Sequence, residues 1–453
     1  MIVMSDLEGL ARKMFSRGLA RKDIEKRLAD EILDFKDTSV PDARRLSSAV
    51  IDEVESSRGA LEGEIPFMAP IYSGITMGNQ GVGCRGTGDF FVHGLIADFS
   101  DSSRGVILSP RDMDDAGAIG VDGGGIIVAK MEGMHSRLSD FPFLAGFHVT
   151  RAAFRDLYVK GAVPAGLLVD IHLADDADVG KLFDFMAGVA TVCDAAGCPI
   201  LGGSTLRIGG DMVIGTRITG GVSAIGAAGV IFPRRDVQKG DAIVMTEGAG
   251  GGTICTTAIY SGHPEVVQET LNLKFLTASK IILEGGWKSS IHCMADVTNG
   301  GLRADLHEIG GEAGCGAVVV ESRVSSMVNG RVKVLLDESG IDYLGVSLDS
   351  LLIFCTGEAA EGIVLDLRKA GIRSTVIGRT TKSPEVRIER DSGVSELLPR
   401  FRESAYTRVK MVVDTGEPSN APEMERMLRK AVDHAMARKK EAMDLIRRTE
   451  ASA

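Results

Sequence analysis

The chain has few aromatic side chains and no excess of positive charge, and both shortages exclude classes of function. Phe, Tyr and Trp make up 5% of its 453 residues, so a platform that stacks nucleic-acid bases is not expected. Lys and Arg number 51 against 62 Asp and Glu, which gives a formal net charge of −11. Binding to a phosphate backbone requires clustered Lys and Arg. We therefore predict that no nucleic acid is a partner.

Long apolar runs and paired cysteines are also missing. No stretch of about 18 apolar residues occurs, so neither a transmembrane helix nor a membrane partner is expected. Residues 1–6 lead directly into a charged amphipathic pattern rather than a secretory signal. The seven cysteines are odd in number and none forms a CxxC pair, which argues against a disulfide framework and a zinc site. A reducing cytoplasm is the expected location.

Glycine, in contrast, is abundant, and the chain is long enough for several domains. The 56 glycines come in clusters, which favours tight turns and close approach of the backbone to a ligand. A chain of 453 residues has room for two or three domains. We expect helical extensions at 1–58 and 396–453, with α/β domains at 59–236 and 237–395. The extensions would serve packing or oligomerisation.

The central part of the chain alternates strand-like and helix-like runs, which predicts an α/β architecture. Residues 125–129 and 165–171 are apolar runs typical of buried strands, and 181–196 has the spacing of a helix. Further strands are expected at 212–215 and 222–225. A strand, a glycine turn and a helix are expected again in the second domain.

Three aspartates give the most direct indication of chemistry. Asp114 and Asp115 stand side by side where a loop enters an apolar run, and Asp156 lies on a predicted helix. Each group alone could equally be a turn aspartate or a solvated helical one. Carboxylates brought together suit Mg²⁺, which takes a few oxygen ligands in addition to the phosphates of a nucleotide. Together the three residues predict a magnesium site and ATP chemistry.

Two glycine turns could bring the backbone close to phosphate. The first combines two glycines with hydroxyl groups and a guanidinium; its candidate residues are Gly202, Gly203, Ser204, Thr205 and Arg207. The second, at 296–302, reads as a strand, a turn and a helix N-terminus, where a phosphate can bind. Asp296 and Asn299 are its candidate contacts. The alternatives are an ordinary tight turn and a capped helix start.

The segment 81–89 is too rich in glycine for regular structure and could close over a triphosphate. Gly83, Arg85, Gly86 and, on the predicted helix, Arg155 are further candidate nucleotide contacts. The segment is not a Walker loop, because no GK[ST] follows, and no strand leads into it as a dinucleotide fingerprint requires. Cys84 beside Arg85 could have a lowered thiol pKa.

Candidates for direct catalysis are few. Cys84, Arg85 and His135 are the candidates, with Cys84 as a possible nucleophile. For His135 a structural role is the alternative. The catalytic residues are therefore left open by the sequence.

Taken in chain order, these motifs resemble the PurM-like superfamily. It comprises aminoimidazole ribonucleotide (AIR) synthetase, thiamine-monophosphate kinase, selenophosphate synthetase and the hydrogenase maturation factor HypE. Six segments resemble the motifs GDDAAV, VEGVHF, NDLAAMGA, GGDTTR, the DxSDGL turn and GEDYELL: in order, 114–116, 131–136, 155–162, 202–207, 296–302 and 347–352. The resemblance spans roughly residues 73–390. The layout is most similar to a group of HypE- and synthetase-related archaeal proteins.

The resemblance implies a fold and a site. It implies two α/β domains, the first of which pairs with a second copy to form a dimeric β-barrel with ATP and Mg²⁺ nearby. Asp114, Asp115 and Asp156 would be metal ligands, the turn at 202–207 would contact phosphate, and the glycine-rich loop would cover the nucleotide. A small-molecule substrate and a homodimer are the implied partners.

Three departures from the motifs reduce the number of acidic ligands. Arg155 stands where the family has Asn, Ser204 replaces the Asp of GGDT, and Val128 aligns with an Asp in the strand before the second motif. The number of bound metal ions is thus open, and Arg155 could supply a cation in place of one ion. A degenerate site that binds nucleotide without turnover is an alternative.

The leading hypothesis is an ATP-dependent enzyme that transfers a phosphoryl group to a small substrate or activates one of its oxygens. The first alternative is a nucleotide-binding accessory or maturation factor related to HypE. Carbamoyl transfer is not expected, because HypE uses a C-terminal cysteine and the last cysteine here is Cys355. The second alternative is an enzyme similar to selenophosphate synthetase, in which Cys84 would be essential.

Overall fold

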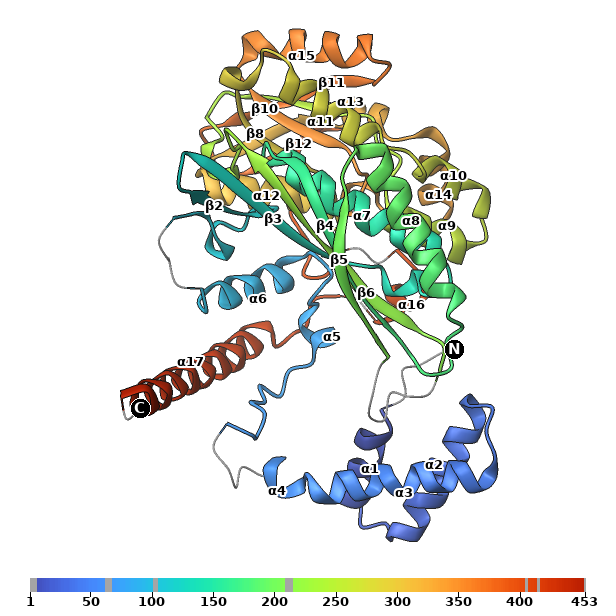
Figure 1. Cartoon of the computed structure of the whole chain (residues 1–453). Helices are drawn as coiled ribbons and strands as arrows, with labels where there is room; N and C mark the ends of the chain where they lie inside the picture. The colour runs from blue at the N-terminus through green and yellow to red at the C-terminus, as the bar shows by residue number, and fades with distance from the viewer. Residues whose placement is uncertain are drawn as a thin grey trace.

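Two β-sheets and the helices packed on them form the centre of the molecule, as the computed structural model shows (Figure 1). The structure describes residues 6–61, 67–100, 105–207, 215–403, 406–413 and 416–451. The strand expected at 212–215 therefore falls almost entirely outside the described residues. Within the described part of the chain, no helix is long and apolar enough to cross a membrane.

The first sheet has six strands and is antiparallel except for one parallel pair at its edge, β4 with β5. Its strands, in spatial order, are β1 (Val106–Leu108), β2 (Gly117–Val121), β3 (Gly125–Gly133), β6 (Ile218–Ala228), β4 (Val163–Leu173) and β5 (Ile200–Arg207). The strands expected at 125–129, 165–171 and 222–225 lie within β3, β4 and β6, which confirms them. The helix expected at 181–196 is α8 (Gly180–Ala196).

Among the described residues the second sheet has seven strands, and two neighbouring ones, β7 and β10, are buried at every position. In spatial order they are β13 (Gly393–Glu396), β12 (Val386–Arg390), β9 (Gly316–Val320), β11 (Ser374–Thr381), β7 (Ala242–Thr246), β10 (Leu351–Cys355) and β8 (Ile291–Asp296). Its helices are α9 (Gly252–Ser261), α10 (Val267–Thr270), α11 (Lys274–Glu284), α12 (Gly301–Ala313), α13 (Glu321–Met327), α14 (Gly330–Glu338) and α15 (Gly357–Lys369). The strand–turn–helix expected near Asp296 is β8 followed by α12.

Helix α7 (Pro142–Val159) lies between the two sheets and holds the domains together. It packs against β3 and β6 of the first sheet and against β8 and α11 of the second domain, and one hydrophobic core runs through both domains. A helix with neighbours on all sides must be buried all round, and nearly every residue of α7 is buried. Polar side chains on α7 therefore point into protein interior, where they need partners.

The terminal extensions are helical and differ in how they attach. Helices α1 (Leu7–Ser16), α2 (Arg21–Phe35) and α3 (Val40–Ser56) form a separate unit with its own hydrophobic core, at the bottom of Figure 1. Lys36 ties this unit to the first sheet through ion pairs of 2.6 Å with Asp175 and Asp176. The remaining helices are α4 (Arg58–Leu61), α5 (Met77–Gln80), α6 (Thr87–Ala97), α16 (Arg408–Val413) and α17 (Ala421–Ala451), the last of which packs against α6.

Two glycines allow α7 and α8 to pack closely. A Cβ on Gly188 of α8 would lie 2.1 Å from the carbonyl oxygen of Phe143, and one on Gly146 of α7 would lie 2.1 Å from that of Phe185. Both contacts are with backbone, which cannot rotate away. The approach of the two helices therefore depends on the absence of a side chain at these positions.

We predict that Gly188→Ala lowers the free energy of unfolding by about 1–3 kcal/mol, because overpacking forces the helices apart. The control is Gly311→Ala on α12, where an added Cβ meets nothing within 4 Å. This control should gain up to about 1 kcal/mol from helix propensity. Urea unfolding followed by circular dichroism measures both. Equal stability of Gly188→Ala and the parent would contradict this account of the packing.

Candidate functional site

A cavity of about 260 Å³ opens between the two domains, and most of the motif residues line it. Its wall combines segments that lie far apart in sequence: the glycine-rich loop, the loop before β2, strand β3, helix α7 and the turn between β8 and α12. The lining residues are Gly83, Arg85, Met113, Asp114, Asp115, Lys130, Glu132, Arg155, Asp156, Arg234, Asp296, Thr298 and Asn299. The structure thus brings Asp114, Asp115 and Asp156 to one cavity.

The adjacent carboxylates of Asp114 and Asp115 share a buried lysine. Lys160 Nζ lies 2.6 Å from Asp114 Oδ1 and 3.1 Å from Asp115 Oδ2, and it also donates to the carbonyl oxygens of Phe232 and Met294. Lys160 is fully buried. Burial opposes its charge, but the two aspartates outweigh that effect and raise the pKa of Lys160 above its ordinary value. The ammonium is therefore charged and fixed.

Arg234 pairs with the same two aspartates from another side. Its Nη2 lies 2.5 Å from Asp115 Oδ1, and its backbone N–H donates to Asp114 Oδ2 at 3.0 Å. Burial alone would raise the pKa of Asp115, but Arg234 and Lys160 together hold that pKa below its ordinary value. Arg234 also contacts Glu308 of α12, 3.2 Å away. Asp115 is thus ionised, and both aspartates are paired with basic side chains of the protein itself.

Asp156 has two basic partners of its own. Lys130 Nζ lies 2.8 Å from Oδ2, and Arg155 Nε lies 3.1 Å from Oδ1. Lys130 stands 3.6 Å from Glu132 on the same strand. Although burial disfavours the ammonium, Asp156 and Glu132 raise the pKa of Lys130 above its ordinary value.

These contacts bear directly on the predicted magnesium site. Every carboxylate oxygen of Asp114, Asp115 and Asp156 lies within 3.1 Å of a protein nitrogen. Among the described residues, no group of three His, Cys, Asp or Glu side chains is placed to hold a metal ion. Val128, which aligns with an acidic position of the family, is in the hydrophobic core. The donor set therefore does not fit a resident Mg²⁺ in this arrangement.

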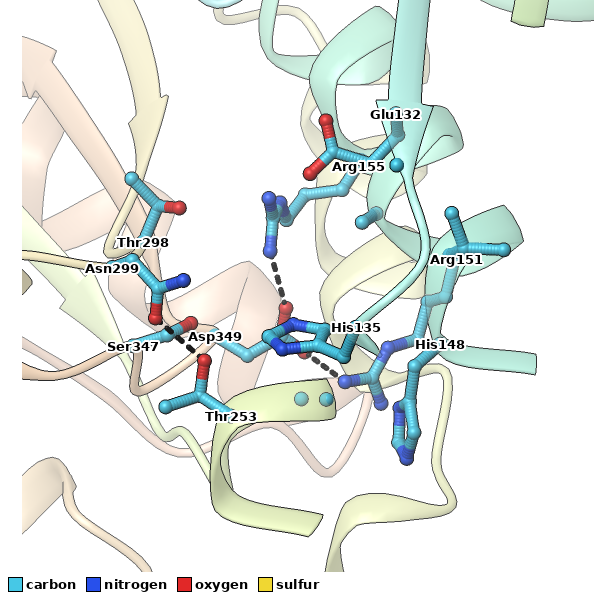
Figure 2. A pocket seen from close by; sticks show the side chains of 15 residues that line it. Glu132, His135, His148, Arg151, Arg155, Thr253, Thr298, Asn299, Ser347 and Asp349 are labelled. Atoms are coloured by element: carbon cyan, nitrogen blue, oxygen red, sulfur yellow. Dashed lines mark hydrogen bonds and ion pairs between the residues drawn. The ribbon is translucent and has the colours of Figure 1, made fainter. Parts of the chain in front are cut away.

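Arg155 lines both the main cavity and a smaller one of about 40 Å³, whose lining side chains are drawn in Figure 2. Its Nη1 lies 3.0 Å from Asp349 Oδ1, and its Nε lies 2.5 Å from Asp296 Oδ2. Arg151, one turn earlier on α7, reaches Asp349 Oδ2 at 2.9 Å. Asp349 has a left-handed backbone, with φ of 55°. Arg155, Glu132, Thr298 and Asn299 line both cavities, so the two are adjacent.

His135 lies at the smaller cavity and is neutral at physiological pH. Burial, together with the positive charges of Lys410 and Arg155, lowers the pKa of His135 to about 4. Its Nδ1 lies 3.4 Å from the hydroxyl of Tyr406, which belongs to the C-terminal extension. Gly252 is packed against the ring, since a Cβ there would be 2.3 Å from it.

Asp296 and Asn299, both predicted as ligand contacts, line the larger cavity, and Asn299 lines the smaller one as well. Burial raises the pKa of Asp296 to about 7; Arg155 opposes this shift and the charge of Asp156 adds to it. The side-chain oxygen of Asn299 accepts a hydrogen bond from the Thr253 hydroxyl at 2.5 Å (Figure 2). Asp296 is therefore a carboxylate that exchanges protons near neutral pH.

The glycine-rich loop reaches the cavity through Gly83 and Arg85, but it is fixed rather than open. The buried carboxylate of Asp89 accepts hydrogen bonds of 2.9 Å from the backbone N–H groups of both residues. Gly86 faces the C-terminal segment, since a Cβ there would lie 2.4 Å from the carbonyl oxygen of Arg400. Cys84 is buried and lines neither cavity.

The predicted phosphate turn at 202–207 is instead part of a strand. Gly202, Gly203, Ser204, Thr205 and Arg207 all belong to β5, the edge strand of the first sheet, and every one of these residues is exposed. None of them lines either cavity. The expectation of a turn was wrong, because pairing with β4 keeps the two glycines extended. These residues are not brought together with the aspartates in a single chain.

Four basic residues of the site were missed by the sequence analysis: Lys130, Arg151, Lys160 and Arg234. Lys130 and Lys160 each interrupt an apolar run, in GIIVAKMEG and LYVKGA. A lysine at such a position is almost never buried without a partner. That pattern was the available signal, and it would have pointed to carboxylates near both lysines.

We predict that Lys160→Met destabilises the fold by about 3–5 kcal/mol, because it leaves the buried charge of Asp114 without its partner. Urea unfolding gives the value. Lys369→Met is the control, since Lys369 pairs with Asp366 on the surface and should change stability little. A Lys160→Met protein as stable as the parent would show that the ion cluster does not hold the fold.

Comparison with known proteins places the chain in a family. Residues 113–228 match the N-terminal domain of AIR synthase related proteins, and residues 238–391 match the C-terminal domain. The uncharacterized protein MJ1416 of Methanocaldococcus jannaschii is 43% identical over 98% of this chain and 99% of its own length. Carbamoyl dehydratase HypE of Rhodobacter capsulatus is 29% identical over 54% of this chain and 75% of its own.

A solved structure shares the fold. The hydrogenase maturation protein HypE in complex with ATP superposes with a TM-score of 0.51 at 20% identity, covering 63% of this chain and 88% of that one. The superfamily resemblance and the two-domain α/β fold that it implied are confirmed. The chain therefore belongs to the family of AIR synthase related proteins, with both the N-terminal and the C-terminal domain present.

Proposed function

We propose that this protein binds ATP in the 260 Å³ cavity and uses it to phosphorylate a small substrate or to activate one of its oxygens. The observation that carries the proposal is the convergence of motif segments from both domains on one cavity lined by basic side chains. That a protein of the same fold is known in complex with ATP supports it.

In this proposal the basic side chains of the cavity bind and polarise the phosphates. Arg85, Lys130, Arg155 and Arg234 all line it and present N–H groups that suit phosphate oxygens. Fixed positive groups around a transferring phosphoryl group stabilise the charge that develops on it. Arg155 stands between the two cavities, so its guanidinium would contact the phosphoryl group during transfer.

The smaller cavity would receive the reacting end of the substrate. At about 40 Å³ it has space for roughly three water molecules, and thus for a group of only a few atoms. Asp296 lines the larger cavity and pairs with Arg155, which lines both, and there it would accept the proton of the attacking group. A pKa near 7 suits a general base that works at neutral pH.

The test is ATP binding by calorimetry and ATP hydrolysis by the purified protein, with water as the acceptor. Hydrolysis should rise with pH through about 7, as the Asp296 base ionises. Asp296→Asn should lower the rate about a hundredfold and flatten this pH profile, without loss of ATP binding.

The control for that variant is Asp241→Asn. Asp241 is also buried and hydrogen-bonded, to His292, but it directly precedes β7 whereas Asp296 ends β8. Both strands run antiparallel to β10, so the two aspartates lie at opposite ends of the strands. Its hydrolysis rate and pH profile should match the parent. Absence of ATP binding by the parent protein would contradict the proposed function itself, whereas an unchanged Asp296→Asn profile would contradict only the assigned base.

A nucleotide-binding accessory factor without turnover is the second candidate. It is favoured by the ion pairs that occupy all three aspartates, since these carboxylates are not available to a catalytic metal. ATP binding without hydrolysis would support it. A chemistry like that of selenophosphate synthetase has less support, because Cys84 is buried away from both cavities.

We also propose that the protein is a homodimer, as the family resemblance implies. One face of the first sheet exposes apolar side chains, including Ile119, Ile127, Met131 and Leu168, with Met131 64% exposed. Contiguous apolar surface of this kind is typical of an interface. A second copy of the chain would cover it.

We expect light scattering to give the mass of a dimer for the parent and of a monomer for the double variant Ile127→Lys, Met131→Lys. Two lysines on each copy would place like charges in an apolar contact. Val334→Lys is the control, since Val334 is a comparably exposed apolar residue on α14. A monomeric parent protein would refute the dimer.

A further inference from the structure

The cavity of the proposed nucleotide site carries its own cations, one beside every carboxylate that would hold a metal. We propose that it binds the phosphates of its ligand without a divalent metal ion, through Arg85, Lys130, Arg155 and Arg234, while Lys160 keeps the aspartate pair neutral. The inference rests on the proposed function, because it concerns how the same cavity recognises a nucleoside triphosphate.

The carboxylates that would hold a metal are already occupied. Mg²⁺ demands near-octahedral oxygen ligands at short distance and gives up its water reluctantly. To reach Asp114 or Asp115 it would have to displace Lys160, which is fully buried. To reach Asp156 it would have to displace both Lys130 and Arg155. Each displacement separates a cation from a carboxylate with which it is paired.

Two arginines that line the cavity, Arg85 and Arg234, each have a buried N–H donor without an acceptor in the described part of the chain. The Nε of Arg234 and the Nε of Arg85 are buried, and neither has a hydrogen-bond partner among the described residues. Arg234 as a whole is only 1% exposed, and both residues line the cavity. A buried unsatisfied donor calls for a ligand, water or ion that completes it. A guanidinium N–H group is completed by an acceptor oxygen, of water or of an anion, and not by a metal ion.

A metal ion bound to a nucleotide screens nearby carboxylates from the phosphates and binds phosphate oxygens. Here Lys160 and Arg234 screen Asp114 and Asp115, and Lys130 screens Asp156. A planar guanidinium binds phosphate oxygens directly, and an ammonium serves as a point charge. Both tasks are thus covered by side chains of the chain itself.

The test is calorimetric titration of the full-length protein with ATP in excess Mg²⁺ and, separately, in excess EDTA. We expect the two dissociation constants to agree within about threefold, a difference of less than 1 kcal/mol. Titration with inorganic tripolyphosphate in EDTA should also show binding, since the donors recognise phosphate. Binding of ATP that weakens more than about tenfold in EDTA overturns the inference but leaves the proposed function standing. No binding in either medium overturns both.

A variant should create the metal dependence that the parent lacks. Lys130→Gln removes the charge beside Asp156, so ATP binding in EDTA should weaken about tenfold and Mg²⁺ should restore it in part. Lys36→Gln is the matched control, because Lys36 is similarly accessible and also pairs with two carboxylates, but away from the cavity. Its ratio of affinities with and without Mg²⁺ should equal that of the parent. A Lys130→Gln protein whose binding stays indifferent to Mg²⁺ argues against the inference; circular dichroism confirms that it is folded.

Discussion

The ion cluster around Lys160 is the interaction on which the rest of the structure depends. Its ammonium contacts Asp114 of the first domain and the carbonyl oxygens of Phe232 and Met294, which belong to the connection between the domains and to the second sheet. Arg234 extends the cluster to Glu308 on α12. Buried charges are tolerated only when they are paired. These contacts therefore fix the orientation of the two domains relative to each other. The cavity between the domains keeps its shape for the same reason.

Helix α7 supplies charged side chains to the site between the two domains. Arg151 and Arg155 follow each other by one turn and point to the same carboxylate, that of Asp349 in the second domain. Asp156 faces the other way, to Lys130 on the first sheet. Because residues three to four apart share a face of a helix, one buried helix can supply cations to one wall and a carboxylate to another. Arg155, on this helix, is one of four residues that line both cavities.

Much of the fold, and part of the site, could be predicted from the sequence. Apolar periodicity was sufficient to predict β3, β4 and α8. The order of the motifs was sufficient to predict that Asp114 and Asp156 lie at one cavity. The partners of these aspartates were missed, because ion pairing depends on tertiary contacts that periodicity does not contain. The glycines at 202–203 suggested a turn, since local preference cannot anticipate that a neighbouring strand, β4, will hold them extended. The dimeric barrel and the site roles of individual residues remain predictions.

The contacts between the C-terminal segment and the glycine-rich loop have a consequence for biosynthesis. Arg400 and Phe401 accept hydrogen bonds from the backbone N–H groups of Thr87 and Gly88, and Arg402 binds the carbonyl oxygen of Asn79, 323 residues earlier. These acceptors leave the ribosome roughly 300 residues after the loop that they bind, and after every described strand of both sheets. The glycine-rich side of the cavity must therefore wait, unfinished, until Arg400 and Phe401 emerge, and a product truncated before them would lack a completed pocket even though both sheets had formed.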